Sequence, residues 1–97
     1  MINQGKTQKM DELVNLVLKQ MGLYQQYKEQ EIAEIWKEVV GNMIATRTKS
    51  LRMTDGKLFV SFTSSVVRNE VSLVKEGIMS ALNEKAGEKI VKEIIIR

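Results

Sequence analysis

The chain has no cysteine, no histidine and no proline among its 97 residues. Without cysteine and histidine it can form no disulfide, no thiolate or imidazole zinc site, and no active site built on a thiol nucleophile or an imidazole base. The chain also has no glycine-rich loop that could hold a phosphate and no calcium-binding spacing. We therefore expect a protein that is not an enzyme and that uses no cofactor and no metal.

Carboxylates are the remaining groups for acid and base catalysis. Glu31, Glu34 and Glu38 fall on one side of a predicted helix, opposite its apolar side. A solvated helix surface explains them better than a catalytic pair, which would need a desolvated cleft. The sequence also has no secretory signal and no apolar run long enough to span a membrane, so we expect a cytoplasmic protein with no membrane partner.

Apolar residues recur at helical spacing in three segments. These lie at about residues 8–22, 30–44 and 64–87. Trp36 is on the apolar side of the second segment, where we expect a core anchor, and Gly41 marks a bend or an end of that helix. Residues 1–7 are polar, with Thr7 as the expected helix cap, so we expect a disordered tail ahead of a single domain over residues 8–97.

Strand patterns occupy the remaining sequence. Asp55 and Gly56 favour a tight hairpin turn between strands at about residues 46–53 and 58–63, and residues 90–97 are rich in β-branched side chains. The hairpin is antiparallel, whereas the later strand, helix, strand connection makes a parallel pair. The chain is therefore predicted to be α+β, in the order ααββαβ, with a three-stranded mixed sheet and the helices on one face.

Basic residues gather around the hairpin. From Arg47 to Arg68 there are five Lys and Arg residues against Asp55, so the segment carries +4, while the whole chain carries +3. Alternation places Arg52, Lys57 and Phe59 on one exposed side, and cations around an aromatic ring suit single-stranded nucleic acid. Two alternatives stay open: a solvated hairpin surface, and a Phe59 covered by the first helix or by a second subunit.

Several short motifs in a fixed order resemble the DciA-like family. They are Ile35-Trp36-Lys37-Glu38-Val39-Val40-Gly41, Asp55-Gly56-Lys57-Leu58-Phe59-Val60, Ser64-Ser65, Asn69-Glu70-Val71, Leu82-Asn83 with Gly87, and Ile94-Ile95-Ile96-Arg97. The resemblance spans roughly Leu13 to Arg97. It implies a fold like that of K-homology domains and a role with the bacterial replicative helicase, as a loader that binds DNA.

The resemblance also implies roles for individual residues. Trp36 and Gly41 would be framework positions, and Arg47, Lys49, Arg52 and Lys57 would be candidates for DNA contact. To these expected nucleic-acid contacts we add Phe59, because of its exposed position with Arg52 and Lys57, and Arg68, because of its proximity alone. The leading expectation is a non-enzymatic adaptor of DNA replication that binds single-stranded or duplex DNA, or RNA, with weak sequence selectivity. The alternative is a protein-interaction or homodimerisation module that uses the exposed sheet face, with Phe59 and Ile95, and no nucleic acid.

Overall fold

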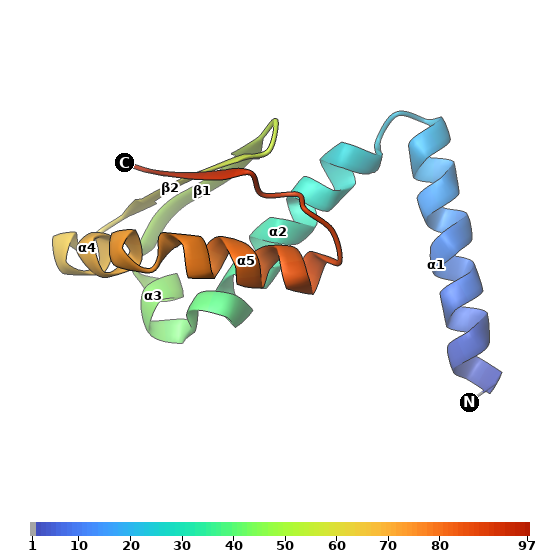
Figure 1. Ribbon diagram of the computed structural model, residues 1–97, viewed down its shortest axis with the longest axis horizontal. Coiled ribbons are helices and arrows are strands. Elements are labelled where there is room, and N and C mark those ends of the chain that lie inside the picture. The colour runs from blue at the N-terminus through green and yellow to red at the C-terminus, as the bar shows by residue number, and fades with distance from the viewer. Residues whose placement is uncertain (1) are drawn as a thin grey trace.

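The computed structural model describes the backbone of residues 2–97 and the side chains of Met10 and of residues 12–97. Within these residues, five helices and three strands form the domain (Figure 1). Their bounds are α1 Ile2–Gln20, α2 Tyr24–Val40, α3 Asn42–Thr46, β1 Thr48–Thr54, β2 Lys57–Phe62, α4 Ser65–Leu73, α5 Lys75–Ala86 and β3 Glu93–Ile96. The α+β class and the order ααββαβ are confirmed, with two of the predicted helices each divided in two.

Those two divisions have different local geometry. Gly41 has a φ of +87°, which a residue with a Cβ rarely adopts, so it ends α2 and lets α3 start in a new direction. The second division is at Val74, which leaves helical geometry between α4 and α5 with φ −116° and ψ 19°. The start of α4 is as predicted, because the Ser64 hydroxyl accepts a hydrogen bond of 3.3 Å from the Val67 amide.

The three strands form one mixed sheet with β2 in the centre. Strand β1 pairs antiparallel with β2, and β2 pairs parallel with β3, as the sequence predicts. Helices α4 and α5 connect the parallel pair. The register between β1 and β2 shifts between Thr48 and Ser50, which makes Lys49 the extra residue of a bulge. Because of this shift, Thr48 can face the helices although Ser50 does not.

The hydrophobic core lies between one face of the sheet and the helices. Leu58, Val60 and Phe62 of β2 are buried there, as their alternation predicts. The helical side chains buried against them include Ile32, Trp36, Val71, Ile78 and Leu82. Trp36 is 3% exposed, and its indole Nε1 donates a hydrogen bond of 3.1 Å to the Thr48 hydroxyl. Trp36 is therefore a core anchor with a satisfied polar atom, as predicted.

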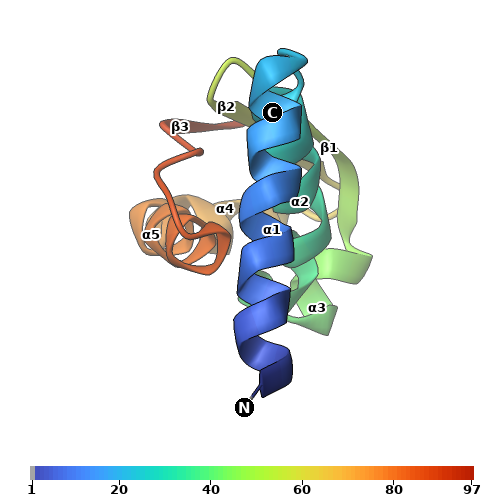
Figure 2. The ribbon, with the colours of Figure 1, turned by 90° about the vertical axis from the view of Figure 1, so that its right-hand side faces the viewer.

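Helix α1 stands away from the rest of the domain (Figures 1 and 2). It begins at Ile2, ahead of the start near Thr7 that the sequence predicts, and it contacts α2. The Cα radius of gyration is 15.2 Å, whereas a compact domain of this length is expected to have about 12.5 Å. The projecting helix therefore leaves the molecule extended, with a longest dimension of 46 Å.

Candidate nucleic-acid interface

The helices cover one face of the sheet and leave the other face open (Figure 1). Arg52, Phe59 and Ile95 are register partners across β1, β2 and β3, so they form one row on this open face. Arg52 is exposed, and Phe59 and Ile95 are half-buried. Helix α1 stands apart from the sheet and so does not cover its open face (Figure 1). The alternative in which the first helix covers the Phe59 ring is therefore wrong.

Two arginines flank the Phe59 ring. The guanidinium Cζ of Arg52 lies 5.5 Å from the ring centroid, and that of Arg97 lies 4.9 Å from it. Both distances are within the range of cation–π attraction. Arg97 is held there because its amide donates a hydrogen bond of 2.9 Å to the Val60 carbonyl, which continues the pairing of β3 with β2. We call Arg52, Phe59 and Arg97 the open-face cluster.

Arg97 is the site residue that the sequence prediction missed. Alternation along the last strand already places Arg97 on the same side as Ile95. Its approach to Phe59, however, depends on the parallel register Phe59 to Ile95, which no local pattern gives. In the part of the chain that the structure describes, no salt bridge involves Arg52, Lys57 or Arg97. Arg52 and Arg97 are therefore available to an anion.

The rows on either side of the open-face cluster differ in charge. Toward the hairpin turn, Lys57 is the register partner of Thr54 and Glu93, so a carboxylate offsets its charge. Toward the other end, the hydroxyls of Ser50 and Ser61 hydrogen-bond to each other. The positive charge on the open face is therefore greatest around Phe59 and at the end of the sheet where Arg97 lies.

The hairpin turn is fixed from two sides. Asp55 and Gly56 have φ of +51° and +80°, as a tight two-residue hairpin turn requires. The Gly56 amide donates a hydrogen bond of 3.2 Å to the Glu29 carboxylate of α2, and the Gly56 carbonyl accepts one of 2.8 Å from the Lys92 amide. A Cβ at position 56 would come within 3.1 Å of the Lys92 side chain. These contacts hold the first two strands and β3 in one rigid sheet.

The other predicted contact residues lie outside the open-face cluster. Arg47 follows α3, and its guanidinium donates a hydrogen bond of 3.1 Å to the Met43 carbonyl. Its own carbonyl accepts a hydrogen bond of 2.9 Å from the Thr63 amide, so Arg47 lies where β2 runs into α4. Lys49 is exposed at the bulge, and Arg68 is exposed on α4, in the helical layer. The structure thus brings Arg52, Lys57 and Phe59 onto one face, and it leaves Arg47 and Lys49 near the end of the sheet away from the hairpin turn and Arg68 on α4.

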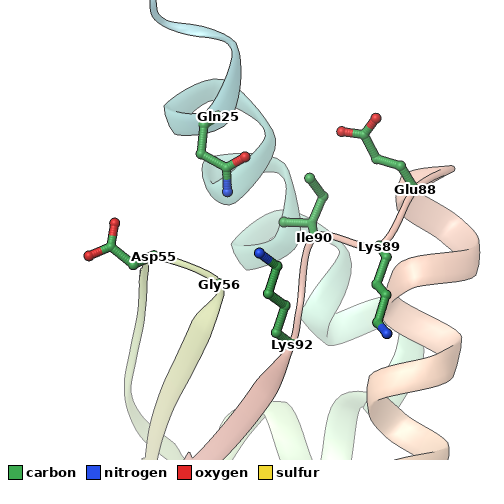
Figure 3. A pocket seen from close by; sticks show the side chains of 7 residues that line it. All are labelled: Gln25, Asp55, Gly56, Glu88, Lys89, Ile90 and Lys92. Atoms are coloured by element: carbon green, nitrogen blue, oxygen red, sulfur yellow. The ribbon is translucent and has the colours of Figure 1, made fainter.

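A hollow of about 370 Å³ lies between the hairpin turn, the start of α2 and the loop before β3 (Figure 3). Its lining residues are Gln25, Asp55, Gly56, Glu88, Lys89, Ile90 and Lys92. The carboxylates of Asp55 and Glu88 lie on opposite sides of it (Figure 3). They therefore do not form the close carboxylate pair that acid and base catalysis would need. Among the described residues, no three potential metal ligands come together.

One titratable group near this hollow is perturbed. Burial raises the pKa of Tyr24 above its usual value of 10.0, and the hydrogen bond to Glu88 and the carboxylates of Glu88 and Glu31 raise it further. The phenol donates to the Glu88 carboxylate over 3.0 Å. On its other side, the Lys19 ammonium lies 4.7 Å from the Tyr24 ring centroid. Tyr24 thus joins α1, α2 and the loop after α5, which is a structural role.

Asn83 has a structural role as well. Its side-chain amide donates a hydrogen bond of 2.9 Å to the Val91 carbonyl, and its side-chain oxygen accepts one of 2.8 Å from the Val91 amide. This two-way pairing fixes the loop that leads from α5 into β3. The position of β3, and with it that of Arg97, depends on this loop.

The family described as Dna[CI] antecedent, DciA, matches residues 9–96. The chain belongs to the DciA family. The match covers nearly the whole chain, so the predicted resemblance is confirmed. No curated protein matches the chain.

Membership of the DciA family supports a role related to loading of the replicative helicase in DNA replication. The family consists of helicase loaders and is not known for catalysis. The helicase is accordingly the implied partner. In the part of the chain that the structure describes, no helix is both long enough and apolar enough to cross a membrane.

Proposed function

We propose that this chain is a cytoplasmic, non-enzymatic adaptor that binds single-stranded DNA on the open face of its sheet while it assists loading of the replicative helicase. The observation that supports this most is the position of Phe59 between two guanidinium groups, 5.5 Å and 4.9 Å from its ring. A loader acts where the duplex opens, so single strands are the form of DNA that it meets.

The chemistry of the open-face cluster suits an unpaired strand. A base can stack on an aromatic ring, or on an arginine guanidinium plane beside it, whatever its sequence, and a base–aromatic contact is worth about 1–3 kcal/mol. Arg52 and Arg97 would then neutralise the phosphates on either side of the stacked base, and the Ser50 and Ser61 hydroxyls add polar contacts in the same face. Binding of this kind has little sequence selectivity.

The remaining cations extend the proposed path of the strand. Lys57 stands at the hairpin end of the open face, Arg47 and Lys49 stand near its other end, and Arg68 is on α4, which follows β2. Lysine and arginine contacts to phosphate position the backbone without reading the bases. We therefore assign to these four residues the sequence-independent part of the affinity, and to Phe59 the preference for single strands over duplex.

The test is fluorescence anisotropy with labelled single-stranded and duplex oligonucleotides across a salt series. Removing one contact to a phosphate should lower the magnitude of the slope of log affinity against log salt by roughly 0.7 for single strands. We expect the double variant Arg52→Glu, Lys57→Glu to bind more weakly and with a flatter slope. The matched control is Lys37→Glu, Lys75→Glu, which makes the same change of charge on exposed positions of α2 and α5.

The control pair should keep the affinity and slope of the unchanged protein. Equal losses of affinity in both double variants would mean that overall charge, and not the open face, determines binding. An unchanged slope in Arg52→Glu, Lys57→Glu would contradict the assignment of the open face.

The second candidate function uses the same face for another protein. Ile95 lies beside Phe59 and is half-buried, so the centre of the open face has an apolar strip that a partner chain could cover. This alternative requires no nucleic acid. Absence of binding to any oligonucleotide at low salt would favour it.

A further inference from the structure

Six of the twelve exposed large hydrophobic residues in the described chain lie on α1 or directly after its last residue, far from the open face. Met10 and Met21 are 65% and 64% exposed, and Val14 and Val17 are each 50% exposed. We call these four residues the α1 seam. The half-buried residues Asn15 and Leu18 mark the side of the helix that faces α2, and Val14 borders a hollow between α1 and α2. The α1 seam therefore lies next to the side of α1 that faces α2, and each of its four side chains is at least 50% exposed.

The spacing of the α1 seam is that of a helix pairing with another helix. Met10, Val14, Val17 and Met21 are separated by four, three and four residues, which is the repeat of a coiled-coil contact line. Leu13, also exposed, flanks this line. By contrast, a helix whose only partner is its own domain would be expected to place its apolar line inward.

The order of residues in the α1 seam is the same in both directions. Read from either end, the residues are Met, Val, Val and Met, and the spacings are four, three and four. In an antiparallel pair centred between Asn15 and Leu16, Met10 therefore meets Met21 of the second copy, and Val14 meets its Val17. A two-fold interface requires such self-complementarity, because each residue must suit the residue that its own symmetry mate presents.

The solvent-exposed area of the molecule also indicates a second copy of the chain as the partner. The chain exposes 6940 Å², whereas a folded monomer of 11.1 kDa is expected to expose about 5,700 Å². The excess of roughly 1,200 Å² exceeds the approximately 800 Å² that each partner buries in a standard interface. A second copy paired along α1 would bring the exposed area closer to that of a compact protein.

We propose that the α1 seam is a self-association surface, on which two copies of this chain pair their α1 helices antiparallel about a two-fold axis. The pairing leaves both open faces uncovered, because α1 stands at one side of the molecule and the sheet at the other (Figure 1). The dimer would hold two open-face clusters. This inference goes beyond the proposed function and does not depend on it.

Sedimentation velocity from micromolar to near-millimolar concentration tests the pairing. The unchanged protein should shift from monomer to dimer as its concentration rises. The variant Val17→Glu places a charge in the seam and should raise the dimer dissociation constant more than about tenfold. The matched control is Leu16→Glu, because Leu16 is also exposed on α1 but lies off the seam, and this variant should associate as the unchanged protein does.

Cysteine cross-linking tests the antiparallel arrangement, since the chain has no cysteine of its own. A mixture of the single variants Met10→Cys and Met21→Cys should form a mixed disulfide, and neither variant alone should cross-link efficiently. Cross-linking of each variant to itself would overturn the antiparallel pairing. A strict monomer at every concentration, or equal dissociation by Leu16→Glu and Val17→Glu, would overturn the seam as the interface.

Discussion

The two faces of the sheet use the same strands for different purposes. On the helix side, Leu58 and Val60 are 0% and 1% exposed and pack within the apolar core. On the open side, the residue between them is Phe59, half-buried and flanked by two arginines. Strand alternation separates these environments by a single residue along the chain. A change on one face should therefore alter stability, and a change on the other should alter binding.

The largest expected effect is on the free energy of unfolding, which should fall more for a change on the helix side of the sheet than for one on the open side. Leu58→Ala removes a fully buried side chain from the central strand and should lower the free energy of unfolding by about 2–5 kcal/mol. Phe59→Ala removes only cross-strand contacts, each worth about 0.2–1 kcal/mol, and should cost less. Urea denaturation followed by circular dichroism measures both changes.

For DNA affinity we expect the opposite order, with a larger loss for the variant on the open side than for the variant on the helix side. Phe59→Ala should weaken single-stranded DNA binding by about 1–3 kcal/mol, which is the value of one stacked base, and Phe59→Tyr should retain most of the affinity. Leu58→Ala, assayed at a temperature where it remains folded, should bind as the unchanged protein does. Two variants with equal losses in both assays would remove the distinction between the faces.

A smaller effect is expected at Arg97, which measures the contribution of a single cation on the open face. Arg97→Gln keeps a polar side chain and removes its charge. The salt slope for single strands should fall in magnitude by roughly 0.7, the value of one phosphate contact. Lys75→Gln on α5 is the control, and its slope should not change. Equal slopes for Arg97→Gln and the unchanged protein would exclude Arg97 from the binding face.

The smallest effect concerns the junction that Tyr24 forms, away from both faces. The raised pKa of Tyr24 means that the folded state keeps the phenol proton to higher pH than the unfolded state does. This contribution to stability is complete below pH 10.0 and is lost as the pH rises through the folded pKa. The stability of the unchanged protein should therefore fall relative to Tyr24→Phe above about pH 10 in denaturation experiments. A stability difference between the two proteins that does not change with pH in that range would contradict the raised pKa of Tyr24.

Local sequence patterns predicted much of this structure because the features concerned depend on residues that are close together in the sequence. Alternation in β2 correctly placed Leu58 inward and Phe59 outward, and the Asp55-Gly56 pair correctly predicted the hairpin turn. The helical spacing around Trp36 predicted its burial. Each of these depends on neighbours in the sequence, so the sequence holds the information directly.

Other features depend on contacts between distant segments. The approach of Arg97 to Phe59 depends on the pairing of β3 with β2, which is fixed in turn by the Asn83 contacts to Val91. The break at Val74 has no glycine or proline to mark it. The direction of α1, which leaves its apolar seam outside the domain, is set by contacts with α2 and by the Lys19 contact to Tyr24.

Amide chemical shifts recorded by NMR during titration with a short single-stranded oligonucleotide would show directly whether the open face binds the strand. If the open face binds the strand, the largest shifts should fall on Arg52, Phe59, Ser61, Ile95 and Arg97, with little change along α2 and α5. Shifts concentrated on the helical layer, or no shifts at low salt, would contradict the account.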